Sequence, residues 1–401
     1  MEEYNLSKQV IIGEGIFKFK DIRRIIYKIF NIFNLPEDKN IRILLKPNCN
    51  NDLNALIGNS TDLRIIISII DELRSRGYKK IIIAEGCNCG ISHLGIDVLK
   101  RLRIKDLGNV LGVDVIDLNK TEFREIKLAD DKLVKVSEEL FKADFVINLP
   151  KLKTHMEATI SIATKNLMGC LQGLEKRRIH DNFFPNIVSL GEQIRVDLNI
   201  VDGIVAMEGD GPGDGIAKKV GCIIAGKDCF FVDTVCAKLM GFDIDEIEYL
   251  RLKKNYFTEK DLKILSDIKN KFNFLRPKKN LAASVLLKNI FVRPRYWKIF
   301  DPLFSSGPIP DFLYKIKVRQ DVYILDEINV KEIKMIGNNR ILEEYCPMEL
   351  RAENGKIPMN KCIKCMYCYI LDSNSFKING DLGYLQQHIN RFGKHIIRLS
   401  L

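Results

Sequence analysis

The stretch TDLRIIISIIDELRSRGYKKIIIAEG, residues 61–86, contains a helix followed by a strand. Its first part is an amphipathic helical run, in which Thr61 is placed to cap the helix and Gly77 to end it. The second part, KKIIIAEG (79–86), is a continuous apolar run, as expected of a strand that is buried on both faces. A helix that leads directly into such a strand predicts an α/β fold.

Similar apolar runs occur on either side of this unit and are separated by helical stretches. They are IRILL (41–45), VDVIDL (113–118), ADFVINLP (143–150), LNIVDG (198–203) and VGCIIAG (220–226). We therefore predict an α/β main domain over residues 1–268, with a largely parallel sheet and helices on both faces. A basic, aromatic-containing connector (269–335) and a small C-terminal ferredoxin-like cluster domain (336–401) are expected to follow.

The composition indicates a globular protein of the reducing cytoplasm. Apolar residues make up 46% of the 401 residues and charged residues 29%. No run reaches about 18 apolar residues, and the N-terminus MEEYNLSKQV has no apolar signal region. In such a chain the eleven cysteines are expected to be reduced thiols or metal ligands.

Positive charge is concentrated late in the chain. Residues 271–340 hold 14 Lys and Arg against 6 Asp and Glu, out of a net charge of +11. The segment, which contains the single Trp297, predicts contact with an acidic partner or peripheral contact with a membrane through residues 271–320. The alternatives are a solvated surface and a packed linker. Nucleic-acid binding is disfavoured because no recognised motif accompanies the charge.

The segment NKCIKCMYCYI (360–370) carries the strongest chemical signal. Cys362, Cys365 and Cys368 stand three apart, and Cys346 precedes a proline sixteen residues upstream of the triplet. In bacterial ferredoxins one cluster is held by a C-x2-C-x2-C triplet and by the Cys-Pro of the partner motif. We predict that these four cysteines bind one [4Fe–4S] cluster, with a structural zinc ion as the alternative.

The remaining positions of a two-cluster motif hold no cysteine. They fall at Ile336, Asn339, Leu342 and Asp372, which together would be the ligands of the second cluster. The tail therefore resembles a ferredoxin module reduced to one cluster.

Polar residues follow several of the predicted strands. They are Lys46, Asn48, Lys151, Lys153, His155, Lys165, Asn166 and Asp202. Ligands of open α/β sheets bind beyond the carboxyl ends of the strands, and lysines at that edge suit a phosphate or carboxylate. His155 could exchange a proton at neutral pH. Taken singly, each residue could instead cap a helix or meet solvent.

Two other groups have weaker patterns. In MEGDGPGDG (207–215), Glu208, Asp210 and Asp214 could bind a hard cation, although a tight turn explains the same glycines. No Walker A or G-x-G-x-x-G motif is present. Three thiols near strand ends could form a second soft-metal or redox site, or be buried as small apolar groups. These thiols are Cys49, Cys87 and Cys89.

Four motifs resemble the family known as domain of unknown function 362. They are LLKPN, INLPKLKTHMEATISIATKNLMG, VDGIVAMEGDGPGDG and VGCIIAGKDCFFVDTVCAKLMGFD, and the resemblance covers roughly residues 8–250. Members often carry a C-terminal ferredoxin-type domain. The resemblance implies a fold and an iron–sulfur association, but no reaction.

These observations predict an iron–sulfur oxidoreductase that acts on an anionic substrate, with a ferredoxin or flavoprotein as its redox partner. We assign His155, Lys153 and Lys151 to catalysis and the other strand-end residues to substrate binding. Because one cluster transfers single electrons, a bound flavin is a further expectation. The alternatives are an electron carrier without catalysis and a non-redox enzyme with a structural cluster.

Overall fold

The computed structural model describes residues 2–4, 9–88, 91, 95–278, 327–337 and 339–392. Most of the predicted connector, including Trp297, lies outside these residues, as does Cys89. The proposed membrane contact through 271–320 therefore stays a prediction. Residues up to Lys278 pack with the main sheet: the N–H of Phe274 donates to the Met240 carbonyl at 3.0 Å, and that of Gly209 to the Leu275 carbonyl at 3.0 Å.

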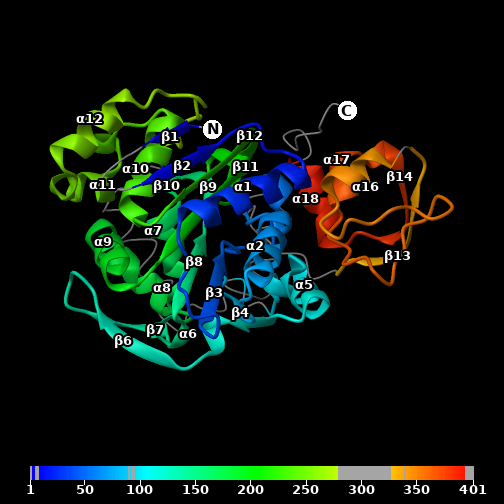
Figure 1. Ribbon diagram of the computed structural model, residues 1–401, viewed down its shortest axis with the longest axis horizontal. Coiled ribbons are helices and arrows are strands. Elements are labelled where there is room, and N and C mark those ends of the chain that lie inside the picture. Colours follow the sequence, from blue (N-terminus) through cyan, green and yellow to red (C-terminus); the bar gives the residue numbers. More distant parts are fainter. Residues whose placement is uncertain are drawn as a thin grey trace, which may run out of the picture.

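The core of the main unit is a ten-stranded sheet (Figure 1). Its main path has the order β1-β2-β12-β11-β8-β3-β4-β5, and the hairpin of β9 and β10 joins it through β11. The strands are β1 (Glu2–Tyr4), β2 (Val10–Gly13), β3 (Arg42–Pro47), β4 (Lys80–Glu85), β5 (Asp114–Asp117), β8 (Phe145–Leu149), β9 (Lys151–His155), β10 (Thr159–Ser161), β11 (Leu198–Asp210) and β12 (Asp214–Gly226). A separate two-stranded sheet pairs β6 (Phe123–Lys127) with β7 (Leu133–Ser137).

The sheet is parallel across its centre and antiparallel at one edge. β11, β8, β3, β4 and β5 run parallel, whereas β12, β2 and β1 are added antiparallel. The prediction of an α/β fold with a mostly parallel sheet is confirmed. The antiparallel edge was not predicted, because it forms through the β11–β12 hairpin rather than through a crossover helix.

Helices cover both faces of the sheet (Figure 1). Ile43 and Leu45 of β3 point into the core that contains α1 and α2, while Leu44 points into the opposite core with α9 and α10. This alternation explains why the strands read as continuous apolar runs. The main-unit helices of four or more residues are α1 (Phe19–Ile32), α2 (Leu63–Ser75), α4 (Val98–Arg101), α5 (Ile104–Leu111), α6 (Glu139–Lys142), α7 (Ala163–Asn166), α8 (Glu175–Arg178), α9 (Phe183–Gln193), α10 (Cys229–Met240), α11 (Glu248–Leu252) and α12 (Glu259–Asp267).

The start of α2 differs from the prediction by one residue. Asp62 is the N-cap, and its carboxylate accepts the N–H of Arg64 at 2.9 Å. Thr61 instead donates its hydroxyl to the Leu149 carbonyl at 2.7 Å and accepts the N–H of Asn48 at 2.8 Å. Thr61 therefore ties the loop after β3 to the end of β8, and the cap role falls to Asp62.

The glycine-rich segment 207–215 is the β-hairpin turn between β11 and β12. Its acidic residues are engaged separately: Glu208 pairs with Lys218 at 2.7 Å, Asp214 pairs with Arg391, and Asp210 accepts the N–H of Lys278 at 2.7 Å. The residues therefore build a turn and not a shared cation site.

The C-terminal part packs on the α1–α2 face as a small module. It contains β13 (Asn329–Met335), α16 (Arg340–Tyr345), α17 (Tyr367–Leu371), β14 (Phe376–Asp381) and α18 (Tyr384–Phe392). β13 and β14 pair antiparallel, and the apolar side chains of the module continue the core of α1 and α2. A ferredoxin-like fold for this module stays a prediction.

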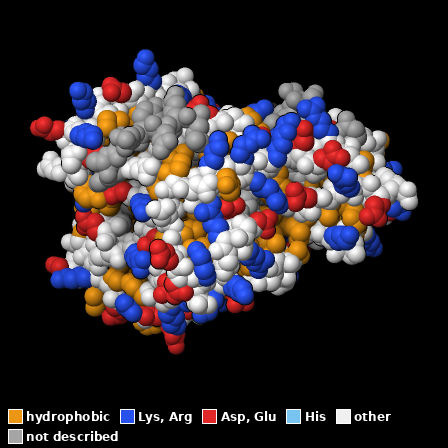
Figure 2. Space-filling view, in the orientation of Figure 1, with side chains coloured by type: hydrophobic (Ala, Val, Ile, Leu, Met, Phe, Trp, Pro, Cys, Tyr) orange, Lys and Arg blue, Asp and Glu red, His pale blue; other side chains and the backbone are white. Residues whose placement is uncertain are grey.

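On the face of the molecule seen in Figure 2, basic and acidic side chains are interspersed. Lys20, Arg24 and Lys28 are exposed on α1. Of the 14 lysines and arginines of residues 271–340, eight lie outside the described residues.

Candidate functional site

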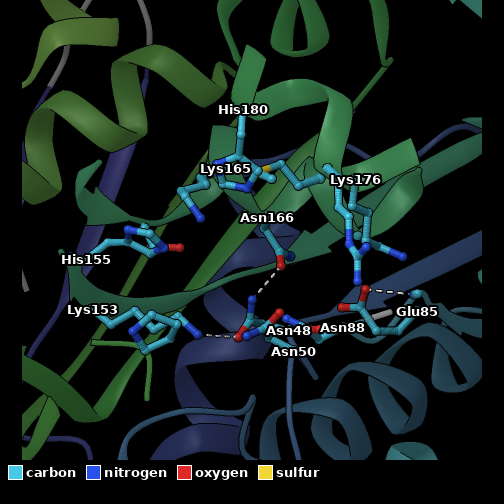
Figure 3. A pocket seen from close by; sticks show the side chains of 16 residues that line it. Asn48, Asn50, Glu85, Asn88, Lys153, His155, Lys165, Asn166, Lys176 and His180 are labelled. Carbon is cyan, nitrogen blue, oxygen red and sulfur yellow. Dashed lines mark hydrogen bonds between the residues drawn. The ribbon is translucent and has the colours of Figure 1, made fainter. Parts of the chain in front are cut away.

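A cavity of about 340 Å³ lies at the carboxyl ends of β3 and β4, bounded by β9 and by the segment from α7 to α9 (Figure 3). Its position is the one expected for a ligand site in an open α/β sheet. The ionisable residues around it are Lys153, Lys165, Lys176, Arg177, His155, His180 and Glu85. Among the described residues, four lysines and arginines and two histidines therefore surround one lining carboxylate, and we refer to this cavity as the basic pocket.

Lys153 is held in the wall of the basic pocket by neutral oxygens. Its Nζ donates to Asn48 Oδ1 at 2.8 Å and to the backbone and side-chain oxygens of Asn59 at 3.1 Å each. The side chain is 1% exposed. Burial, followed by the nearby charges of Lys165 and Lys151, lowers its pKa to about 7. Lys153 can therefore gain or lose a proton at neutral pH.

Lys165, on α7, is partly exposed in the same pocket. Among the described residues its ammonium has no hydrogen-bond or ion-pair partner, and the ring of Phe183 lies 5.9 Å away. Burial lowers the pKa of Lys165 to about 8, and the charge of Glu157 opposes this shift. Its ammonium is available to a ligand.

His155 is oriented by the turn that follows β9. Its Nδ1 accepts the N–H of Glu157 at 3.0 Å and that of Ala158 at 3.2 Å. Burial, Lys165 and Lys153 together hold the pKa of His155 well below its usual value. The ring is therefore neutral, with its proton on Nε2, and it can offer that N–H to a ligand.

A chain of amides supports the floor of the basic pocket (Figure 3). Asn48 Nδ2 donates to Asn166 Oδ1 at 2.7 Å, Asn166 Nδ2 donates to Asn148 Oδ1 at 2.7 Å, and Asn148 Nδ2 donates to Asn199 Oδ1 at 2.8 Å. Each amide fixes the orientation of the next one. This series of hydrogen-bonded amides consequently directs the Asn48 oxygen, a neutral acceptor, toward Lys153.

Lys46 lies behind the basic pocket. Its Nζ is 3.1 Å from each oxygen of Glu85, and both side chains are buried. Gly169 packs directly over this pair: a Cβ at that position would collide with Glu85 Oε1 and approach Lys46 Nζ to 2.7 Å. Lys46 therefore neutralises the carboxylate that lines the pocket.

Lys151 and Asp202 lie away from the basic pocket. They form an ion pair of 2.8 Å in which both side chains are completely buried, and Asp202 also accepts the N–H of Asp62 at 2.8 Å. Lys151 occupies the same face of β9 as Lys153 and His155, but Asp202 of β11 stands beside it in register. Its ammonium supports the sheet and does not face the cavity.

The structure brings five of the predicted site residues to the basic pocket: Asn48, Lys153, His155, Lys165 and Asn166. Sequence reasoning missed Lys176, Arg177 and His180, which come from the α8 segment. The basic run EKRRIH (175–180) was the available signal.

The four predicted cluster cysteines line one small cavity in the C-terminal module. Cys346, Cys362, Cys365 and Cys368 surround it together with apolar side chains that include Ile357 and Leu350. Its volume is about 20 Å³, which exceeds the space needed by one water molecule. None of the four thiols is in a disulfide. We call this space the cysteine cavity.

Backbone N–H groups point at the sulfurs of the cysteine cavity. Lys364 N lies 3.4 Å from Cys362 Sγ. The N–H groups of Leu350, Met348 and Glu349 favour the ionised form of Cys346, and that of Tyr367 does so for Cys365. Burial nevertheless raises the pKa of each thiol. Burial therefore favours the neutral thiol form of the four cysteines, and the neighbouring N–H groups oppose this effect at Cys346 and Cys365.

Among the described residues, the four cysteines of the cysteine cavity included, no three His, Cys, Asp or Glu side chains are grouped so that they could hold a metal ion. Cys49 and Cys87 are both buried, and burial holds their pKa well above the usual value. Since Cys89 lies outside the described residues, the second soft-metal or redox site stays a prediction.

The loop 48–62 contacts both cavities. Asn48 and Asn59 hold Lys153 at the basic pocket, while Asn54 Nδ2 donates to the Cys365 carbonyl at 3.3 Å. At the end of the loop, the hydroxyl of Tyr367 accepts the N–H of Leu63 at 3.2 Å. One short segment therefore separates the cysteine cavity from the basic pocket.

The fold and these sites define an α/β protein with a basic pocket at the carboxyl edge of its sheet and a separate four-cysteine module. Residues 43–238 match the family described as Domain of unknown function (DUF362). This match includes every residue that lines the basic pocket and ends before the cysteines of the module. The family resemblance is therefore supported over residues 43–238.

A curated relative is a thylakoid-associated protein of Synechocystis sp., which is 36% identical over 142 residues. The match covers 33% of this chain and 44% of the relative, so the chain spans less than half of the relative's length. Among solved structures, the lactate racemase apoprotein from Thermoanaerobacterium thermosaccharolyticum matches over 56% of each chain, with 12% identity and a TM-score of 0.33. Within the described residues, no helix combines the length and apolarity needed to cross a membrane.

Proposed function

We propose that this chain is an iron–sulfur oxidoreductase that binds an anionic substrate in the basic pocket and one [4Fe–4S] cluster at Cys346, Cys362, Cys365 and Cys368. The single observation that carries the proposal is the loop 48–62, which holds Lys153 through Asn48 and Asn59 and contacts the Cys365 carbonyl through Asn54, between them. A cluster in the cysteine cavity would therefore adjoin the segment that builds the substrate pocket.

The cysteine cavity fits a cluster by its donor set. Four thiols face one space, the remaining lining is predominantly apolar, and backbone N–H groups point at the sulfurs. Water would find few polar partners there. When bound, a [4Fe–4S] cluster would supply electrons one at a time. An external ferredoxin or flavoprotein would be its electron donor or acceptor.

The residues of the basic pocket would perform the binding and proton chemistry. Lys165 offers an unpartnered ammonium, and His155 offers its Nε2–H. Lys153, with a pKa of about 7, is suited to deliver or accept the proton that accompanies electron transfer. Lys46 would pair with the Glu85 carboxylate behind the pocket.

A non-redox enzyme with a structural cluster is the second candidate. It is favoured by the continuity of the apolar core from α2 into the cysteine module, where Tyr367 is fully enclosed against the start of the helix. A module packed in this way could contribute only to the stability of the folded protein, without a role in the reaction.

Reoxidation of the reduced protein distinguishes the two candidates. The dithionite-reduced chain is mixed anaerobically with a panel of phosphate and carboxylate compounds, and the visible absorption is followed in a stopped-flow instrument. We expect saturable reoxidation by at least one compound, with loss of the reaction in Lys165→Met. If no compound reoxidises the cluster, and iron-free protein still converts one of them, the redox proposal is wrong.

A further inference from the structure

Two lysines in the basic pocket lack an acidic partner. Lys153 Nζ contacts only amide and carbonyl oxygens, all of them neutral. Lys165 Nζ has no hydrogen-bond or ion-pair partner among the described residues, and Phe183 supplies only a ring contact. A buried cation without a counter-ion costs free energy. The positive charges of these two lysines therefore do not stabilise the fold.

The neighbouring carboxylates already have other side-chain partners. Glu85 is bound by Lys46, Glu157 lies 2.9 Å from Nδ1 of His180, and Asp202 is bound by Lys151. The other ionisable neighbours are Cys49, which is buried with a raised pKa, and His155, which is neutral. Lys176 and Arg177 add further positive charge along the same pocket. An excess of positive charge therefore remains around Lys153 and Lys165.

We propose that Lys153 and Lys165 together seat one doubly charged oxyanion group of the substrate, and that this group binds with uptake of protons by the two lysines. The inference rests on the proposed anion-binding function and specifies its substrate class as a compound with a phosphate-like dianion. Two positive charges at one end of a cavity match a compact dianion better than a single carboxylate. The neutral ring of His155 adds a hydrogen-bond donor without adding charge.

The pKa values of the two lysines support the proton uptake. They stand at about 7 for Lys153 and about 8 for Lys165, both lowered chiefly by burial. A bound dianion would favour the ammonium forms and raise both values. Binding should therefore weaken as the pH rises above this range, since the free protein must then take up protons.

Sulfate is a suitable probe because its charge does not change across the neutral range. Binding to the full chain is measured by titration calorimetry, in two buffers of different ionisation enthalpy, between about pH 7 and about pH 9. We expect the affinity to fall roughly tenfold or more over this interval and the heat to depend on the buffer. Nitrate, a single charge, should bind at least about tenfold more weakly.

Variants of the partly exposed Lys165 identify the group that titrates. Lys165→Met should weaken sulfate binding about tenfold or more. Lys165→Arg should retain binding near neutral pH with less proton uptake, because arginine stays charged. Lys28→Met, on the exposed face of α1, is the matched control and should bind like the unchanged chain.

The inference is overturned if sulfate does not bind, if nitrate binds equally well, or if binding has no dependence on pH or buffer. Unchanged binding in Lys165→Met would also overturn it. The iron and sulfide contents of the same samples are determined in parallel. An intact cluster that is still reoxidised by an anionic compound would leave the proposed oxidoreductase standing while the dianion inference falls.

Discussion

Lys165 shows how an individual residue can serve binding at the expense of stability. Its ammonium has no acidic partner among the described residues, and burial lowers its pKa to about 8. The unfolded chain would hold the proton up to a pKa of about 10.4. Between these values the unfolded state binds more protons, so the stability of the folded protein rises with pH across this interval.

We therefore expect Lys165→Met to stabilise the ligand-free protein near pH 7, by on the order of 1–2 kcal/mol. The gain should shrink as the pH rises from about 8 to about 10, because the lysine is then neutral in the folded chain. Thermal unfolding at several pH values measures this, with Lys28→Met as the control. A variant that is less stable than the unchanged chain near pH 7 would show that Lys165 has a stabilising partner.

The residue at position 48 determines whether the Lys153 ammonium has a negatively charged partner. Its oxygen accepts the Lys153 ammonium at 2.8 Å as a neutral group. Asn48→Asp would place a carboxylate there, raise the pKa of Lys153 and repel an incoming anion. We expect sulfate affinity to fall at least about tenfold.

Asn40→Asp is the matched control, because it adds the same charge on an exposed turn before β3. Circular dichroism of both variants verifies folding. Sulfate binding that is equally strong in Asn48→Asp and Asn40→Asp would mean that the anion does not approach Lys153.

At the scale of elements, α2 links the main sheet to the cysteine module. Its first N–H groups have no partners within the helix. The Asp62 side chain satisfies one of them, and the hydroxyl of Tyr367 accepts another from Leu63 at 3.2 Å. The module thus caps the helix that follows the loop 48–62.

Tyr367→Phe should destabilise the protein by about 1–3 kcal/mol, because it leaves the buried N–H of Leu63 unsatisfied. Tyr369→Phe, two residues further along the same helix and only partly buried, should change stability much less. Chemical denaturation of both variants measures the difference. Equal stabilities would indicate that the module does not contribute to the start of α2.

The strands and their order differ in how far the sequence predicts them. β3, β4 and β8 each contain three or more consecutive apolar residues because helices cover both faces, so their patterns alone identify them. The antiparallel edge depends on which strands become neighbours, and periodicity contains no such information. The same is true of Lys151: it was predicted to follow the strand 143–150, but it lies in β9, and its partner Asp202 comes from a separate strand.

At the scale of the whole molecule, two sites that are distant in sequence meet at one loop. The basic pocket combines residues from β4, β9 and the α7–α8 segment, and the cysteine cavity lies more than 150 residues later. The cysteine spacing allowed the four thiols to be grouped from sequence. Lys176 and Arg177 were missed because a basic run on a short helix is equally typical of solvated surfaces.

Removing one cysteine tests whether the four cysteines of the cysteine cavity bind iron as one site. Cys346→Ala should lose most of the bound iron, although the other three cysteines remain in sequence. Cys170→Ala, which changes a thiol buried in the main unit, should keep the iron. Iron analysis after anaerobic purification measures both, and an iron content unaffected by Cys346→Ala would exclude this residue as a ligand.

The most direct test of the central claim is the analysis of iron, sulfide and zinc in the anaerobically purified full chain, together with EPR after reduction by dithionite. The account predicts about four iron and four sulfide per chain and the signal of one reduced [4Fe–4S] cluster. One zinc ion without sulfide, or no metal at all, would contradict it.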